Sequence, residues 1–176
     1  MNIIESDKIF GLKVVELEIF RDHRGEFVET FNQKKHTFFD ENDKLIVFIE
    51  DDISISNYSV IRGLHGDNNT WKLVQCLSGE IHINIVDFRQ GSRTYLNAES
   101  FILNDVERKQ ILIPAGCLNG TQCLSEQSIF SYKQNSYYQT SIGQTTIKWN
   151  DPKLNLYWPI SNPILSDRDA NAILLK

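Results

Sequence analysis

The chain has 176 residues, of which 41% are hydrophobic and 23% are charged, a balance ordinary for one soluble domain with a buried core. Its formal net charge is −5, and it has no basic run that could displace counterions from a polyanion. We therefore exclude general binding to nucleic acid or to an anionic membrane, and we expect a few local cations to hold any anionic ligand.

Residues 1–7 lack the basic and apolar regions of a signal peptide, and no apolar run reaches the length of a membrane span. The three cysteines, Cys76, Cys117 and Cys123, form neither a Cys-x-x-Cys pair nor an even set, which favours reduced thiols. We therefore expect a cytoplasmic protein.

Apolar and polar residues alternate along most of the chain with the period of two that is typical of half-buried strands. In chain order, the predicted strands are residues 15–19, 27–31, 45–49, 53–60, 71–77, 81–85, 109–113, 128–133 and 145–149. Short helices are predicted only at residues 34–41 and 167–174. Many short strands separated by glycine-containing turns indicate a β-sandwich or barrel. No linker or repeat divides the chain, so we expect a single all-β domain over residues 1–176.

The tetrapeptide Arg62-Gly63-Leu64-His65, followed by Lys72, combines side chains that suit acid–base chemistry on an anion. Histidine holds or releases a proton near neutral pH, arginine binds phosphate with a planar fork, and an ammonium stabilises an oxyanion. Strict alternation would put Arg62 and His65 on opposite faces of a strand. They can share a site only if Gly63 bends or bulges that strand.

Four further stretches accompany this tetrapeptide. They are Asp22-His23-Arg24-Gly25-Glu26-Phe27-Val28-Glu29-Thr30-Phe31, Ile113-Pro114-Ala115-Gly116-Cys117-Leu118-Asn119-Gly120, Ser131-Tyr132-Lys133 with Tyr137-Tyr138, and Trp158-Pro159 before Leu165-Ser166-Asp167-Arg168-Asp169. In order and spacing, the set resembles the dTDP-4-dehydrorhamnose 3,5-epimerase family of cupin-type nucleotide-sugar epimerases. The resemblance implies a cupin or jelly-roll β-barrel with short peripheral helices.

The resemblance also implies a role for each matching residue. His65 is the base that removes a proton next to the keto group of a nucleoside-diphosphate 4-keto sugar, Asp169 orients it, and Tyr132 returns a proton on the opposite face. Lys72 falls where the family has a lysine near the C4 carbonyl oxygen. The candidates for substrate binding are Arg24, Glu29 and Arg62 at the nucleotide diphosphate, Phe20, Phe27 and Tyr138 near the base or sugar, and Arg168. Lysine is suited to stabilising an enolate oxygen, and a histidine and a tyrosine on opposite faces of the sugar are suited to inverting a stereocentre.

Each assignment has a structural alternative. An isolated barrel histidine or tyrosine is often a satisfied core residue, and an aspartate beside an arginine is often a helix cap beside a solvated charge. The motifs taken together favour a functional role for His65, Tyr132, Asp169, Lys72, Arg62 and Arg24. For Phe20, Phe27 and Tyr138, core packing and ligand contact both stay open.

We expect no metal and no organic cofactor. The four histidines, His23, His36, His65 and His82, contain no His-x-His pair, and Asn119 stands where a metal-binding cupin has a histidine. Zinc and iron sites usually need several convergent imidazole or carboxylate ligands. The chain also lacks a Gly-x-Gly-x-x-Gly fingerprint.

Three stretches depart from the family pattern. Asn119 replaces a histidine found close to the sugar in typical members, and asparagine cannot relay a proton near neutral pH. Two explanations for Asn119 stay open: it forms a tight turn with Gly120, or it restricts epimerisation to one carbon of the sugar. Phe48-Ile49-Glu50-Asp51-Asp52 stands where the family has a stretch of the Phe-x-Gln-x-Asn type, which brings three adjacent carboxylates. The histidine motif continues with Gly66-Asp67-Asn68-Asn69-Thr70-Trp71 in place of the usual Tyr-Gln. Because a carboxylate such as Glu50 can accept two hydrogens from guanine, a GDP-linked heptose or 6-deoxy sugar is an alternative to a dTDP-linked substrate.

We therefore expect a cofactor-independent epimerase that inverts C3, C5 or both in capsule, lipopolysaccharide or deoxysugar biosynthesis. A nucleotide-sugar 3,4-ketoisomerase of the same fold and a non-catalytic sugar-binding β-sandwich stay open as alternatives. The resemblance further implies a homodimer in which residues 20–31 cross to the partner, so that Arg24 and Glu29 act across the interface.

Overall fold

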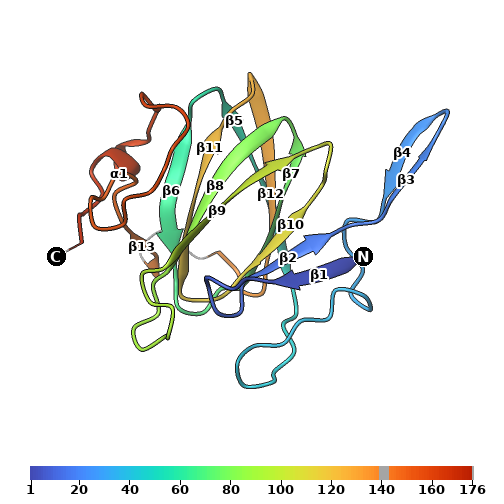
Figure 1. Cartoon of the computed structure of the whole chain (residues 1–176), viewed down its shortest axis with the longest axis horizontal. Helices are drawn as coiled ribbons and strands as arrows, with labels where there is room; N and C mark the ends of the chain where they lie inside the picture. Colours follow the sequence, from blue (N-terminus) through green and yellow to red (C-terminus); the bar gives the residue numbers. More distant parts are fainter. Residues whose placement is uncertain (139–142, 176) are drawn as a thin grey trace.

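Two antiparallel sheets face one another, and a two-stranded hairpin extends from the body beside the N-terminus (Figure 1). The structure, a computed structural model, describes residues 1–138 and 143–175. The six-stranded sheet has the order β1 (Asn2–Glu5), β2 (Lys13–Glu16), β10 (Gln110–Ile113), β7 (Lys72–Ser78), β12 (Gln127–Gln134) and β5 (Glu50–Asn57). The five-stranded sheet has the order β13 (Thr145–Thr146), β6 (Ile61–Gly66), β11 (Cys117–Cys123), β8 (Glu80–Asp87) and β9 (Ala98–Asn104). The all-β class predicted from the alternation and the jelly roll implied by the resemblance are both confirmed.

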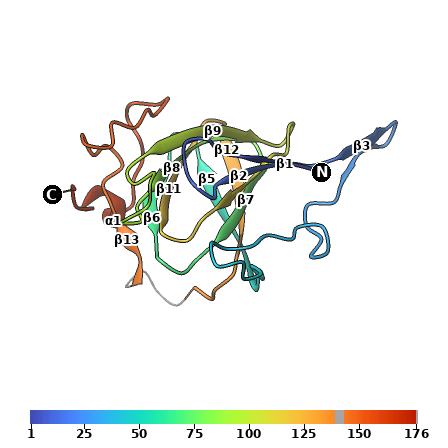
Figure 2. The same ribbon diagram turned by 60° about the horizontal axis from the view of Figure 1, so that its bottom comes forward.

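The remaining elements lie at the two ends of the molecule (Figure 2). The hairpin consists of β3 (Ile19–Asp22) and β4 (Gly25–Val28), and the short helix α1 (Asp167–Ala170) lies near the C-terminus. Among the described residues, no helix is long and apolar enough to cross a membrane.

The core follows from alternation within single strands, as β8 illustrates. Ile81, Ile83 and Ile85 are at most 1% exposed and belong to the main apolar cluster of buried residues. The side chain of Asn84 lies on the opposite face, where its Nδ2 donates a hydrogen bond to the carbonyl of Tyr157 at 2.9 Å. One face of the strand therefore builds the core, and the other holds the C-terminal segment.

Two segments, one C-terminal and one around residues 38–46, cover part of the outer faces of the sheets. The C-terminal one places Leu154 and Trp158 in an apolar cluster with residues of β6, β8 and β11. The segment around residues 38–46 places Phe38 and Ile46 in an apolar cluster with residues of β2, β7 and β10. The first cluster fixes β6, which carries the arginine–histidine motif, against the segment that leads to α1.

The structure replaces two predicted elements and shortens or divides others, since residues 17–18, 29–31, 58–59 and 148–149 lie outside strands. Residues 34–41 form a turn and extended chain instead of a helix, because Phe38 packs into the cluster over the six-stranded sheet. Residues 45–49 form no strand beyond an isolated bridge between Leu45 and Phe39. The structure also adds β1, β9 and β11, and in β11 the polar side chains Asn119 and Gln122 hide the strand pattern. At residues 167–174, the helix is confined to α1.

Gly63 produces the predicted irregularity in β6. Its φ of +131° is a conformation that L side chains rarely adopt, and the register with β11 shifts between the Asn119–His65 and Thr121–Arg62 pairs. A Cβ at Gly63 would lie 2.5 Å from the Cα of Gly120 on β11. The close approach of the two strands thus requires glycine. The prediction that Arg62 and His65 reach one site through an irregularity at Gly63 is confirmed, since both line the same cavity.

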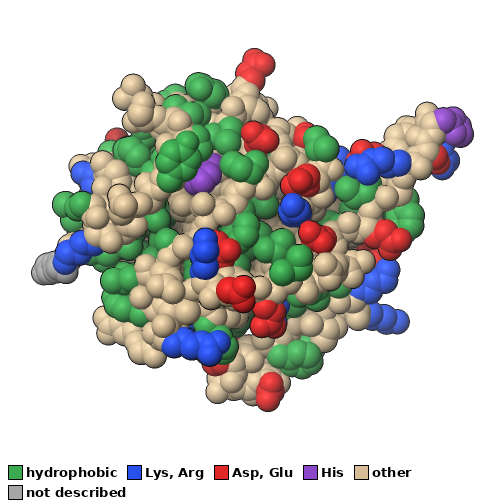
Figure 3. Space-filling view, in the orientation of Figure 1, with side chains coloured by type: hydrophobic (Ala, Val, Ile, Leu, Met, Phe, Trp, Pro, Cys, Tyr) green, Lys and Arg blue, Asp and Glu red, His purple; other side chains and the backbone are tan. Residues whose placement is uncertain are grey.

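The β3–β4 hairpin stands clear of the body (Figure 3). The side chains of Phe20 and Phe27 are 53% and 68% exposed, and their ring centroids lie 6.4 Å apart. Arg24, at the turn, pairs with Asp22 at 2.6 Å. A short hairpin is marginal by itself, and both aromatic rings of this one stay exposed in the chain.

Candidate active site

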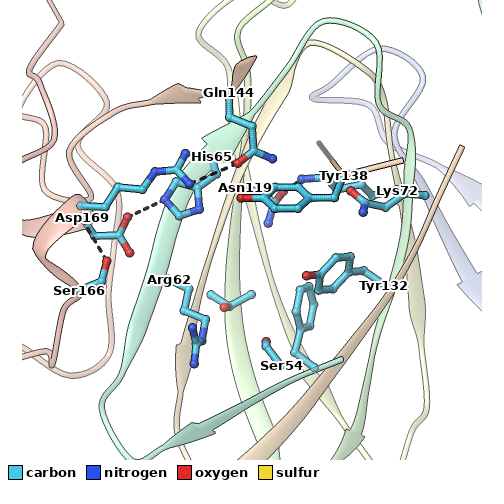
Figure 4. A pocket seen from close by; sticks show the side chains of 14 residues that line it. Ser54, Arg62, His65, Lys72, Asn119, Tyr132, Tyr138, Gln144, Ser166 and Asp169 are labelled. Atoms are coloured by element: carbon cyan, nitrogen blue, oxygen red, sulfur yellow. Dashed lines mark hydrogen bonds and ion pairs between the residues drawn. The ribbon is translucent and has the colours of Figure 1, made fainter. Parts of the chain in front are cut away.

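A cavity of about 330 Å³ opens between the two sheets. Figure 4 shows the side chains that converge on it from β5, β6, β7, β11, β12, α1 and the loop after β12. Eight predicted site residues line it: Arg62, His65, Lys72, Asn119, Tyr132, Tyr138, Arg168 and Asp169. Five others, Phe20, Arg24, Phe27, Glu29 and Glu50, do not.

His65 and Asp169 form the tightest polar contact in the cavity. The Nε2 of His65 lies 2.5 Å from Oδ1 of Asp169, although the two residues are 104 positions apart in sequence. The other carboxylate oxygen accepts a hydrogen bond from the backbone N–H of Gly63 at 3.3 Å. With Nε2–H donated to Asp169, the lone pair of the imidazole is on Nδ1, which can accept a proton.

The first turn of α1 fixes Asp169. Ser166 caps the helix, and its Oγ accepts a hydrogen bond from the backbone N–H of Asp169. Asp169 is only 2% exposed. Burial raises its pKa, but the hydrogen bonds from His65 and Gly63 outweigh burial, and the net pKa lies below the ordinary value. The carboxylate therefore stays ionised beside the imidazole, where it stabilises an imidazolium.

Lys72 extends from β7 into the cavity and is 9% exposed. Its Nζ donates a hydrogen bond to Oδ1 of Asn119 at 3.4 Å. Burial lowers the pKa of Lys72, Asp67 partly opposes that effect, and Arg168 adds to it. A cation held in a partly desolvated cavity interacts strongly with an oxyanion that forms beside it.

Tyr132 extends from β12 on the opposite side of the cavity from His65 (Figure 4). Its ring lies 5.6 Å from that of Phe130, two residues earlier on the same strand. Burial raises the pKa of Tyr132, and the negative charge of Asp52 adds to that effect. The hydroxyl is therefore held in the protonated form, which can donate a proton.

Two arginines supply further positive charge to the cavity. The Nε of Arg62 donates to Oγ of Ser56 at 2.9 Å, and its Nη2 donates to the carbonyl of Ile55. The Nη2 of Arg168 donates to Oγ1 of Thr146 at 2.6 Å. Both guanidinium groups are thereby anchored to strands beside the cavity.

Three predicted residues lie together on the β3–β4 hairpin instead of at the cavity. They are Phe20, Arg24 and Phe27. Glu29 follows β4 and pairs with Lys35 at 2.7 Å. Within this chain these four residues do not meet the cavity.

Glu50 lies behind the cavity wall. Its Oε1 accepts hydrogen bonds from the side chain of Gln134 and the backbone N–H of Tyr138, both at 2.9 Å, and its Oε2 accepts from the same N–H at 3.1 Å. Both carboxylate oxygens are therefore engaged within the chain, an arrangement that does not favour readout of a guanine base by Glu50.

Sequence reasoning missed six further lining residues: Ser54, Thr121, Phe130, Gln134, Gln144 and Ser166. Three of them could have been predicted, because residues two positions apart on a strand share a face. Thr121 follows Asn119 by two positions, and Phe130 and Gln134 lie two positions before and after Tyr132. Gln144 had no such signal. It reaches the cavity beside Arg168, whose guanidinium lies 3.3 Å from its Oε1.

Residues 1–138 and 143–175 contain no group of three or more His, Cys, Asp or Glu side chains arranged to hold a metal ion. His65 is the single histidine among the described residues that line the cavity, and the other basic side chains there are Lys72, Arg62 and Arg168. Such a cationic set suits an anionic ligand.

Comparisons with known proteins agree over almost the whole chain. A family model described as dTDP-4-dehydrorhamnose 3,5-epimerase matches residues 6–176. The dTDP-4-dehydrorhamnose 3,5-epimerase of Salmonella typhimurium is 37% identical over 179 residues, which cover 99% of this chain and 96% of that protein.

Two solved structures are similar in fold and in sequence. The dTDP-4-dehydrorhamnose 3,5-epimerase of Bacillus anthracis, with TDP and PPi bound, has a TM-score of 0.89 at 34% identity and covers 99% of each chain. The dTDP-6-deoxy-D-glucose-3,5-epimerase of Legionella pneumophila, in complex with dTDP-4-keto-L-rhamnose, has a TM-score of 0.87 at 34% identity, over 98% of this chain and 92% of that one. The chain belongs to the dTDP-4-dehydrorhamnose 3,5-epimerase family of isomerases.

Proposed function

We propose that the whole chain is one epimerase domain acting on a nucleoside-diphosphate 4-keto sugar without a cofactor. One observation carries the proposal: the His65–Asp169 pair and the Tyr132 hydroxyl face each other across a cavity that Lys72 also enters (Figure 4). A planar enolate between these groups can lose a proton on one face and gain one on the other.

The reaction follows from the placement of the protons. Nδ1 of His65 takes a proton from the carbon next to the C4 ketone. The electron pair of that C–H bond forms a C=C bond to C4, and the π electrons of the carbonyl move onto its oxygen. The ammonium of Lys72 stabilises the resulting enolate, while Asp169 stabilises the imidazolium. Tyr132 then donates its proton to the opposite face of the same carbon, the C4 carbonyl re-forms, and the stereocentre is inverted. The tyrosinate regains a proton from solvent and the His65 imidazolium loses one to solvent, which restores both groups.

The substrate is held by charge at its diphosphate. Arg62 and Arg168 are the cations anchored beside the cavity, and arginine suits bidentate phosphate contacts. The relatives solved with TDP or with dTDP-4-keto-L-rhamnose support a dTDP-linked 4-keto-6-deoxy sugar, as does the engagement of both Glu50 oxygens within the chain. A product for capsule, lipopolysaccharide or a secondary deoxysugar is consistent with this substrate class.

We further propose a homodimer in which the β3–β4 hairpin reaches the partner's cavity. The exposed rings of Phe20 and Phe27 support this, as do Ile53 and Ile55, which are 59% and 51% exposed on β5 at the edge of the six-stranded sheet. Arg24 then meets the nucleotide of the partner subunit. Dilution to monomers should weaken nucleotide binding, and unchanged affinity in a demonstrated monomer contradicts the crossed arrangement. The expected compartment is the cytoplasm, in keeping with three buried free cysteines.

The decisive experiment is solvent-deuterium exchange followed by NMR on matched dTDP- and GDP-linked 4-keto sugars. Deuterium at C3 alone identifies a single-site epimerase and gives Asn119 a role in selectivity, whereas deuterium at C3 and C5 identifies a 3,5-epimerase. His65→Asn should abolish exchange and retain nucleotide-sugar binding. Exchange only with GDP-linked sugars would overturn the proposed nucleotide, and equal exchange by His65→Asn would remove His65 from the mechanism.

A further inference from the structure

The acidic run Glu50-Asp51-Asp52 is divided between the two faces of β5. Asp51 points outward, where it pairs with Lys133 at 2.5 Å and its side chain is 56% exposed. Glu50 and Asp52 lie on the other face, the same face on which Ser54 reaches the cavity. Alternation along a strand therefore gives two of the three carboxylates an inward position.

A single amide joins the two inward carboxylates. The Nε2 of Gln134 donates to Oε1 of Glu50 at 2.9 Å and to Oδ2 of Asp52 at 3.2 Å. Gln134 is 3% exposed and lines the cavity. Glu50 also accepts from the backbone N–H of Tyr138, another lining residue. Neither carboxylate is itself among the lining side chains, so both act through the residues they hold.

Asp52 is also placed directly opposite Tyr132. The two residues are partners in the antiparallel register of β5 and β12, so their side chains lie on the same face of the sheet. Side chains at directly opposite positions have Cβ atoms about 4.5–5.5 Å apart. An ionised carboxylate at such a position opposes the formation of a second negative charge on the tyrosine.

Charges of both signs surround the Tyr132 hydroxyl. Burial has the largest effect and raises its pKa; Asp52, Tyr138 and Glu50 raise it further, and Arg62 on β6 opposes them. The other charged groups that line the cavity are His65 on β6, Lys72 on β7, and Arg168 and Asp169 on α1. Burial and Glu50 also raise the pKa of Asp52, but Asp52 is fully ionised at the alkaline pH where a tyrosine titrates.

We propose that Glu50 and Asp52 form a positioning pair for the proton-donating side of the cavity. Their hydrogen bonds fix Gln134 and Tyr138 in the wall, and the negative charge of Asp52 keeps Tyr132 protonated between turnovers. The proposal rests on the proposed function, in which Tyr132 donates the proton. It gives the acidic run a role in acid–base chemistry and none in direct substrate contact.

The test is a UV titration of tyrosine ionisation in the free full-length protein. The signal of Tyr132 is isolated by subtracting the same measurement on a matched background that carries Tyr132→Phe. Asp52→Asn keeps the side-chain shape and removes the charge. Asp51→Asn is the matched control, because it removes the same charge from the adjacent residue on the outward face.

The expected order of effects is specific. Asp52→Asn should lower the titration midpoint of Tyr132, Glu50→Gln should lower it by a smaller amount, and Asp51→Asn should leave it in place. The alkaline limb of the pH–rate profile should move to lower pH only in the first two variants. Because Lys72 also loses a proton in alkali, the UV titration of Tyr132 is the deciding measurement.

Equal midpoints in Asp52→Asn and Asp51→Asn would overturn the proposal. If circular dichroism shows that Asp52→Asn is misfolded, an unchanged midpoint in Glu50→Gln overturns it instead. Failure of the proposed function has a different signature, since the titration needs no substrate. A lowered midpoint combined with full activity of Tyr132→Phe would uphold the charge effect and remove Tyr132 as the proton donor.

Discussion

Replacing Asp169 by asparagine tests the pairing on which the proposed chemistry depends. The carboxylate accepts from His65 Nε2 at 2.5 Å through one oxygen and from the Gly63 N–H at 3.3 Å through the other. Asparagine has one acceptor oxygen, so one of these two groups loses its acceptor. If the new oxygen faces Gly63, the new NH₂ faces His65 and holds its ring with the proton on Nδ1. The proposed base then cannot accept the substrate proton.

The size of the effect follows from the charge that is removed. A hydrogen bond to a charged group contributes about 1.5–3 kcal/mol, and each 1.4 kcal/mol corresponds to about a tenfold change in rate. The imidazolium forms only as the proton moves, so the loss falls on the transition state. We expect Asp169→Asn to lower kcat by about 10-fold to 150-fold. KM should change little, because Asp169 is 2% exposed and offers little surface to a sugar.

The assay is the initial rate of solvent-deuterium exchange at saturating substrate, with kcat and KM obtained from the same NMR series. Asp167→Asn is the matched control, because Asp167 is an exposed carboxylate on the same short helix. The cap of α1 should survive in both variants, since Ser166 accepts from the backbone of Asp169 and not from its side chain. Equal rates in the two variants would refute the orienting role of Asp169.

Three further outcomes are expected. Lys72→Met should lower kcat by about 100-fold to 1,000-fold in the exchange assay with nucleotide affinity retained, because a preorganised contact to the oxyanion is lost; a rate within a few-fold of the parent protein contradicts this role. Gly63→Ala should destabilise the fold by more than about 1–3 kcal/mol, which is the usual cost of a disfavoured backbone conformation, because the added Cβ would also lie 2.5 Å from Gly120 Cα. Thermal unfolding measures this loss of stability, and an unchanged Tm contradicts it. The Asp87→Asn variant should be about 2 kcal/mol less stable than the parent protein at neutral pH. Burial raises the pKa of Asp87, but hydrogen bonds from Arg89, Ser92 and Thr94 outweigh it and lower that pKa from 3.8 to about 2. Because the pKa of Asp87 is lower in the folded state, its ionised carboxylate stabilises the parent protein above pH 3.8, and this stabilisation is lost as the pH falls through about 2. The free energies of chemical unfolding of the parent and the variant should therefore converge in acid. A difference that does not change with pH contradicts this.

Local sequence patterns predicted the strands with the strongest apolar alternation. The runs at residues 71–77, 81–85, 109–113 and 128–133 fall within a residue or two of β7, β8, β10 and β12. The same rule failed where tertiary contacts decided the backbone. The segment around Phe38 is not helical because its aromatic side chains cover a sheet, and β11 was hidden because its polar residues are satisfied by neighbouring strands and by the C-terminal segment, as Gln122 is by Ile160.

The residues of the candidate site also differ in how far the sequence predicted them. Motifs predicted His65, Lys72, Tyr132 and Asp169, and the fold brings all four to one cavity. No local pattern indicated Gln144, which reaches the cavity from the loop before β13. The hairpin residues Phe20, Arg24 and Phe27 stand apart from the cavity within one protomer, so their predicted role depends on a second subunit.

The all-β class, the order of the motifs and the residue types that suit proton transfer were predictable from the sequence, because alternation and side-chain chemistry are local properties. Which of those residues meet depends on the packing of the folded chain. It shifts the register at Gly63 so that Arg62 and His65 share a cavity, and it brings Asp169 to His65 across 104 residues. It also turns Glu50 and Asp52 toward Gln134 while Asp51 faces solvent. These contacts depend on how strands pair and sheets pack, and no single segment of the chain specifies them.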